Sequence, residues 1–262
     1  MSWNILTYAF GTEKYLTCQK FLTEHAAQFG VNHIAFTEED LHNTDFYKNN
    51  KEFFETSVLM TEENKFGHSV WKAQIVLMAM EQLEEGDKIF YLDAMDMFHP
   101  EVFAEADELM GDDPCLLVMG GTRNGDYTKR DCFHFMDCDE EDYWESNQLE
   151  SGLCFWKVCD EAKAILNEWE KWLLDERVNG LPTTYSGKPE LDGFREVRRD
   201  QSILTNMAVR DGLPVAGEPF RNFVECNTEY WYERDNKGLV PSYRLIDVYL
   251  RQIKSKYPIQ KV

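Results

Sequence analysis

Two aspartates, Asp93 and Asp96, directly follow a short apolar run in the stretch EGDKIFYLDAMDMFHP, residues 85–100. A carboxylate beside an apolar core is costly unless it is paired, solvated or bound to a cation. Mg²⁺ and Mn²⁺ prefer oxygen ligands, and Mg²⁺ is often held by one or two carboxylates together with substrate phosphates. The pair therefore indicates either a divalent-metal site or a solvated strand end.

Basic residues recur beside the segments that we expect near Asp93, although the net charge of the chain is −21. They are Lys72, Lys129, Arg130, Arg198 and Arg199. A metal and basic side chains together would neutralise a diphosphate, whereas each basic residue alone fits a surface ion pair equally well. Asp200 follows the last two, near the start of an expected helix, where an N-cap or first-turn acid is favourable.

Several better-defined sites are excluded by the motifs that the sequence lacks. There is no GxGxxG after the first expected strand, no GxxxxGK[ST], no GxSxG and no HExxH. A haloacid-type phosphatase needs an aspartate two positions after its nucleophile, and here Met95 occupies that position.

Composition predicts one domain, or two tightly packed halves, over residues 1–262, since 43% of the residues are hydrophobic. The acidic excess argues against binding to nucleic acid or to an anionic membrane surface. The two most acidic stretches, 101–113 and 137–150, are expected to be solvated faces. We expect no signal peptide, because the first 16 residues lack a basic region and a long apolar run. We expect no transmembrane helix, because no apolar run approaches about 18 residues. Seven cysteines without a CxxC pair favour buried thiols and a cytoplasmic location.

Strands and helices alternate along the first half of the chain. Apolar runs predict strands at 3–10, 31–37, 89–92, 115–121 and 149–157. Helical spacing predicts helices at 12–30, 69–86, 101–110, 160–178 and 198–212, with Ser69 as an N-cap and Gly86 as a stop. This alternation is typical of an α/β fold with a mainly parallel sheet, in which ligands bind beyond the carboxyl ends of the strands, where Asp93 and Asp96 lie.

Three segments give weaker signals. We expect polar loops at 122–131 and 181–193, and make no prediction for 40–67. The aromatic tail at 227–245 either closes the core or stacks on a sugar.

The stretch GDKIFYLDAMD resembles the strand-plus-acidic motif of glycosyltransferases with the GT-A fold. Residues 69–94 resemble the WK-helix and YLDA strand of a group of bacterial and viral sugar transferases, and YTKRDCF, NQLESGLCFWK, EWEKWLLDERV and VRRDQSILTNM follow in that group's order. The resemblance spans residues 4–215. It implies a single GT-A-like domain with a Rossmann-like nucleotide-binding half (1–100), a mixed, mainly parallel sheet flanked by helices, and a donor-sugar and acceptor half (101–262).

The resemblance also implies roles for individual residues. It places Asp200 and Glu150 as catalytic carboxylates and Asp93 and Asp96 at an Mn²⁺ or Mg²⁺ ion. The residues expected to bind the nucleotide sugar are Thr7, Tyr8, Gly11, Lys72, Asp93, Ser151, Gly152, Arg199 and Gln201. The chain departs from the family at Met95, the second acidic position of the DxD signature, and it lacks the late histidine that completes many such metal sites, since its last histidine is His134.

The implied activity is transfer of a sugar from a nucleotide-diphosphate donor to a glycan or small hydroxyl acceptor, with a lean towards retention of configuration. An inverting enzyme needs a carboxylate base on the acceptor hydroxyl, whereas in a retaining one the departing phosphate can take the proton. Two alternatives stay open: a non-catalytic nucleotide-sugar or glycan-binding protein, and a metal-dependent phosphohydrolase or nucleotidyltransferase.

Overall fold

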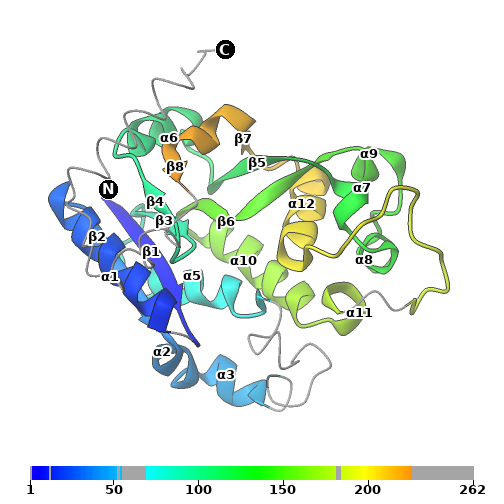
Figure 1. The fold of residues 1–262 in the computed structure, drawn as a ribbon, viewed down its shortest axis with the longest axis horizontal. Helices are drawn as coiled ribbons and strands as arrows, with labels where there is room; N and C mark the ends of the chain where they lie inside the picture. Colours follow the sequence, from blue (N-terminus) through cyan, green and yellow to red (C-terminus); the bar gives the residue numbers. More distant parts are fainter. Residues whose placement is uncertain (1, 12, 52–53, 55–68, 181–183, 226–262) are drawn as a thin grey trace.

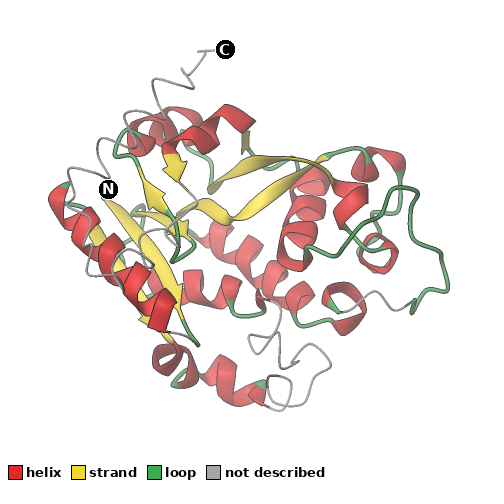
Figure 2. Cartoon of the chain, viewed as in Figure 1, coloured by secondary structure: helices red, strands yellow, loops and turns green. Residues whose placement is uncertain are grey.

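The computed structural model describes residues 2–11, 13–51, 54, 69–180 and 184–225. At its centre is a six-stranded sheet with the strand order β2-β1-β3-β6-β5-β7, flanked by helices (Figures 1 and 2). β1 is parallel to β2 and β3, and β5 is parallel to β7. β6 is antiparallel to its neighbours β3 and β5. The predicted α/β class with a mixed, mainly parallel sheet is confirmed.

The strands of this sheet are β1 (Trp3–Ala9), β2 (Asn32–Thr37), β3 (Lys88–Leu92), β5 (Cys115–Arg123), β6 (Asn147–Lys157) and β7 (Val215–Ala216). The short strands β4 (Met97–Phe98) and β8 (Val224–Glu225) form a second, two-stranded sheet. The longer helices are α1 (Glu13–Gln28), α5 (Lys72–Met80), α6 (Val102–Met110), α10 (Asp160–Leu173) and α12 (Arg199–Asp211). Short helices are α2 (Glu38–His42), α3 (Asp45–Asn49), α7 (Asn124–Tyr127), α8 (Arg130–Phe135), α9 (Glu141–Trp144), α11 (Glu176–Asn179) and η2 (Glu218–Phe223).

Each face of the sheet has its own apolar core, because successive side chains of a strand point to opposite faces. Leu6 and Tyr91 pack with apolar residues of α5, α10 and α12. Ile5 and Phe90, their neighbours in the same strands, pack with residues of α1, α6 and η2. The sheet is therefore covered on both sides, and the edge beyond the end of β3 is left for polar side chains.

Two helices are shorter in the structure than the ranges predicted for them. Ser69 has a φ of 63°, so it is not the predicted N-cap, and α5 begins at Lys72 and ends at Met80. The helix predicted for 160–178 ends at Leu173, and α11 starts again after Asp175, whose side chain accepts a hydrogen bond from the Arg177 N–H.

The prediction of a polar loop at 122–131 is wrong. β5 extends to Arg123, and α7 and the start of α8 follow it. Asn124 is fully buried and its amide donates to Tyr143 O and Asn206 Oδ1, both at 3.0 Å. Polarity is a poor guide to a loop where the polar side chains bond to each other inside the protein.

Within the described residues, no helix is both long and apolar enough to cross a membrane. The described cysteines are buried free thiols, as predicted. The predicted tail at 227–245 and the start of the loop at 181–193 lie outside the described residues, as does most of 40–67 beyond α2 and α3.

Candidate active site

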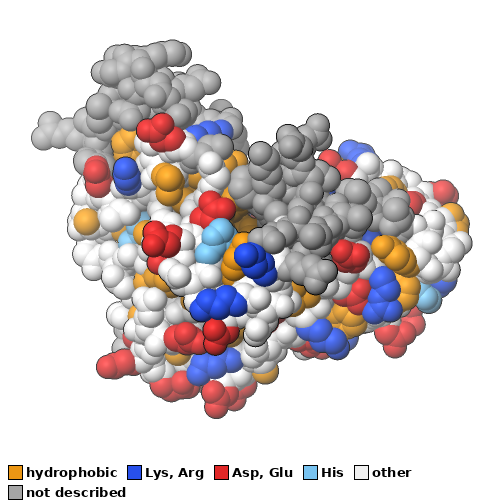
Figure 3. Space-filling view, turned by 90° about the horizontal axis from the view of Figure 1, so that it is seen from below, with side chains coloured by type: hydrophobic (Ala, Val, Ile, Leu, Met, Phe, Trp, Pro, Cys, Tyr) orange, Lys and Arg blue, Asp and Glu red, His pale blue; other side chains and the backbone are white. Residues whose placement is uncertain are grey.

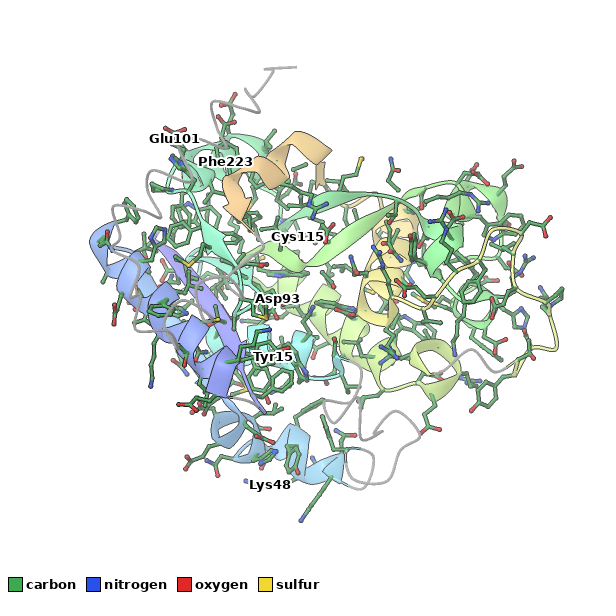
Figure 4. The ribbon with its side chains drawn as sticks, viewed as in Figure 1. Tyr15, Lys48, Asp93, Glu101, Cys115 and Phe223 are labelled. Atoms are coloured by element: carbon green, nitrogen blue, oxygen red, sulfur yellow. The ribbon has the colours of Figure 1, made fainter. Side chains whose placement is uncertain are left out.

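Asp93 leaves the sheet at the carboxyl end of β3, near the middle of the molecule (Figure 4). Its N–H donates to Gly152 O of β6 at 3.0 Å, and its Oδ1 accepts from the Tyr91 hydroxyl at 2.8 Å. The Asp96 N–H donates back to Asp93 O at 2.8 Å, which closes the turn that carries both aspartates. The side chain of Asp93 is 48% exposed, so this carboxylate is accessible to a ligand.

A buried lysine joins Asp93 to the start of α12. Lys72 Nζ lies 2.7 Å from Asp200 Oδ2 and 3.7 Å from Asp93 Oδ1. It also donates to Ser151 Oγ at 3.3 Å, and the Ser151 hydroxyl in turn donates to Asp200 Oδ2 at 2.5 Å. Lys72, Asp93, Ser151 and Asp200 together are called the Lys72 cluster below. It unites elements α5, β3, β6 and α12, which are far apart in the sequence.

The charges of the Lys72 cluster are strongly coupled. Burial alone would lower the pKa of Lys72, but Asp200 and Asp93 outweigh it and hold the pKa above its usual value. Burial, and then the neighbouring Asp93, raise the pKa of Tyr91 well above its usual value, so this hydroxyl stays a donor. Because one ammonium group faces two carboxylates, the cluster has no positive charge to spare.

Gly152 is required by the close approach of β6 to Asp93. A Cβ atom at this position would lie 2.4 Å from Asp93 Oδ2 and 2.9 Å from its Cγ. A side chain at this position would therefore displace the Asp93 carboxylate.

A third carboxylate, that of Glu150, lies on β6 next to the Lys72 cluster. Glu150 Oε1 pairs with Arg221 at 3.2 Å, and its side chain is 24% exposed compared with 12% for Asp200. Gln201 donates to Leu149 O at 2.8 Å and to Glu150 Oε2 at 3.5 Å. Both predicted catalytic carboxylates therefore lie within one region, Asp200 fixed in an ion pair and Glu150 more open.

The residues predicted at the end of β1 have different surroundings. Thr7 is fully buried, and its hydroxyl shares a 2.8 Å hydrogen bond with His33 Nε2 and accepts from Gln19 at 3.0 Å. Tyr8 is 6% exposed and packs on Trp71, with ring centroids 4.5 Å apart. Tyr8 thus contacts the N-cap residue of α5, which directly precedes Lys72, whereas the Thr7 hydroxyl bonds within the protein.

Gly11 has a φ of 79°, so it turns the chain directly after β1 in the left-handed conformation that glycine adopts readily.

The predicted basic cluster is not assembled around Asp93; Lys72 alone of its members pairs with that residue. Lys129 is fully buried and its Nζ is 3.5 Å from Glu176 O. Arg130 pairs with Asp139 at 2.7 Å. Arg198 pairs with Glu196 at 3.5 Å and lies over the Tyr127 ring, 3.9 Å from its centroid. Figure 3 shows how acidic and basic side chains intermingle on one face.

A divalent cation fits this site only if substrate oxygens complete its shell. Within the described part of the chain, no group of three or more His, Cys, Asp or Glu side chains could hold a metal ion. Asp93 Oδ1 already accepts from Tyr91, but Asp93 is half exposed and Asp96 comes from the same turn. Two carboxylates with phosphate oxygens are an ordinary environment for Mg²⁺.

Two contacts of the site were missed at the sequence level. Tyr91 bonds to Asp93, and strand alternation could have revealed it, because residues i and i+2 lie on one face. Arg221 pairs with Glu150 from η2, and nothing local in the sequence indicates this.

No protein-family model matches the chain, and no curated protein matches it. Solved structures that are similar to it include the following two. One is a glycosyltransferase involved in the glycosylation of the major capsid of PBCV-1, with 15% identity, a TM-score of 0.38, and coverage of 65% of this chain and 66% of that one. The other is mouse xyloside xylosyltransferase 1 in its apo form, with 10% identity, a TM-score of 0.45, and coverage of 83% and 85%. Both TM-scores are below 0.5, so neither similarity establishes a function for this chain.

Proposed function

We propose that the protein is a glycosyltransferase that moves a sugar from a nucleotide-diphosphate sugar to a hydroxyl group of a glycan or small acceptor. The observation that carries this proposal is the Lys72 cluster, in which Asp93, at the end of β3, is joined through a buried lysine to Asp200. The motifs around these residues resemble those of sugar transferases, and the fold brings them together from positions 128 residues apart.

The two carboxylates next to the transferred sugar have different tasks in this proposal. Asp200 accepts from Lys72 and Ser151, so it is held in one position and suits hydrogen bonding to sugar hydroxyls. Glu150 is the more exposed and is oriented by Arg221 and Gln201, so it suits contact with the acceptor or with the reacting carbon. In a retaining reaction the departing phosphate takes the acceptor proton; in an inverting one Glu150 takes it.

Asp93 and Asp96 are the residues that would hold a Mn²⁺ or Mg²⁺ ion together with the donor diphosphate. Such an ion neutralises the negative charge that develops on the leaving group. The excess of carboxylates in the Lys72 cluster is consistent with a need for further positive charge when an anionic donor binds.

The test is product formation by the purified chain. It is incubated with uridine, guanosine, adenosine and cytidine diphosphate sugars, with and without Mn²⁺, and release of the nucleoside diphosphate and of free or transferred sugar is measured. The proposal expects turnover of one donor class. Release of inorganic phosphate, or of diphosphate from a nucleoside triphosphate, would instead identify a phosphohydrolase or nucleotidyltransferase, and binding without any turnover would identify a non-catalytic protein.

The test variant and its matched control each change an aspartate that pairs with a lysine. Asp93→Asn is expected to lower turnover at least about 100-fold, since a small displacement of a positioning group costs about that much. Asp107→Asn removes the partner of Lys88 at the opposite end of β3 and should leave turnover within about twofold. Equal effects of the two substitutions would refute the assignment of the site.

A further inference from the structure

Arg199 differs from every other arginine that the structure describes. The seven others each pair with a carboxylate: Arg123, Arg130, Arg177, Arg195, Arg198, Arg210 and Arg221. Arg199 forms no ion pair with a described residue, and its Nε is buried without a hydrogen-bond partner. In a chain with 48 acidic and 27 basic residues, an arginine that is left without a carboxylate is unexpected.

The position of Arg199 connects it to the candidate active site. It is the first residue of α12 and directly precedes Asp200, whose Oδ2 lies 2.7 Å from Lys72 Nζ. Its backbone has a φ of 34°, a left-handed conformation that costs a non-glycine residue free energy. A strained residue that carries an unpaired buried donor is typical of a site that is completed by a ligand.

Lys72 and Arg199 differ in the charge that they can offer to a substrate. Lys72 is 6% exposed and is shared by Asp93 and Asp200. Arg199 is only partly buried, and a guanidinium group matches the oxygens of a phosphate in a two-pronged geometry. Of these two residues, Arg199 is therefore the one whose charge is not already shared by two carboxylates, and Lys72 positions the two aspartates.

We propose that Arg199 binds the phosphate groups of the substrate, which are the diphosphate of the donor if the proposed glycosyltransferase function holds. The proposed function is needed only to say which molecule carries the bound phosphate groups. The anion site itself is carried by the unpaired guanidinium group and its place beside Asp200.

Calorimetric titration of the full chain with inorganic pyrophosphate and with uridine and guanosine diphosphates tests this. Arg199→Gln should weaken binding of pyrophosphate and of the preferred nucleoside diphosphate at least about tenfold, and Arg199→Lys should restore part of the loss. Binding of the corresponding nucleoside should not change. The matched control is Arg198→Gln, which removes a neighbouring arginine that is already paired with Glu196 and should change binding by less than about twofold.

Arg199→Gly separates binding from folding. Glycine adopts the left-handed conformation without strain, so this variant should melt at a higher temperature than the wild type and still lose pyrophosphate binding. Unchanged pyrophosphate affinity in Arg199→Gln, an equal loss of nucleoside affinity, or an equal effect of Arg198→Gln would overturn the proposal. Pyrophosphate binding through Arg199 without sugar transfer would refute the glycosyltransferase and leave the anion site intact.

Discussion

Replacement of Lys72 by methionine tests whether the Lys72 cluster holds the site together. Methionine keeps the length and apolar stem of the side chain but removes the ammonium group. Asp200, with a side chain that is 12% exposed, would then keep only the Ser151 hydroxyl among its two partners. Removal of one member of a buried ion pair typically costs about 3–5 kcal/mol, because the remaining charge is left without compensation.

The measurement is the free energy of unfolding from urea titration at pH 7. We expect Lys72→Met and Asp200→Asn each to be strongly destabilising, and the double variant to be less so than the sum of the two, with a coupling of about 1–3 kcal/mol. Lys88→Met is the control, since Lys88 pairs with an Asp107 side chain that is 51% exposed and should contribute about 0–1 kcal/mol. A cost below about 1 kcal/mol for Lys72→Met, or strict additivity in the double variant, would refute the reasoning.

The pH dependence gives a second measurement on the same residue. The pKa of Lys72 is raised in the folded protein, because Asp200 and Asp93 outweigh the lowering effect of burial. Its contribution to stability is therefore complete below the unfolded pKa of about 10.4 and is lost as the pH rises above that value. The wild type should lose stability there more steeply than Lys72→Met, and parallel curves for the two proteins would contradict the assignment.

Three further substitutions have defined outcomes. Gly152→Ala places a Cβ atom 2.4 Å from Asp93 Oδ2, so turnover should fall at least about tenfold through displacement of that carboxylate; unchanged turnover would show that its position is unimportant. Burial lowers the pKa of His33 to about 4, so the wild type should lose on the order of 2–3 kcal/mol of unfolding free energy as the pH falls from about 6.5 to 4, and His33→Asn should flatten that part of the curve measured by urea titration. Burial raises the pKa of Glu170 to about 7, and its Oε2 has no hydrogen-bond partner, so Glu170→Gln should raise the melting temperature at pH 8 and not at pH 4; an equal shift at both values would exclude this cause.

The elements with regular apolar spacing could be predicted from the sequence. β1, β3, α1 and α6 lie within a few residues of their expected bounds, because burial of one face or both imposes a clear pattern on the residue types. The position of Asp93 at a carboxyl strand end follows from the same pattern. Helix ends were predicted less well, since the conformation of Ser69 and the break before Asp175 depend on local hydrogen bonds rather than on periodicity.

The contacts within the site could be predicted only in part. The motif order placed Lys72, Asp93, Ser151 and Asp200 in one family of sites, but the partner of each charge depends on the packing of α5 and α12 against the sheet. Lys129 is the clearest example of a contact that the sequence does not predict. The sequence grouped it with basic residues that could bind a substrate, but in the structure it is fully buried.

The amount of positive charge near a site cannot be inferred from the number of basic residues near its motifs. In a chain with a net charge of −21, an arginine or lysine meets a carboxylate in most surroundings, and each such pair removes one cation from use by a substrate. Arg130 and Arg198 form such ion pairs with Asp139 and Glu196. Arg199 forms no ion pair with a described residue, although Asp200 and Glu196 are near enough to interact with its charge. In such a protein the unpaired cation, rather than the cluster of cations, indicates where an anionic substrate binds.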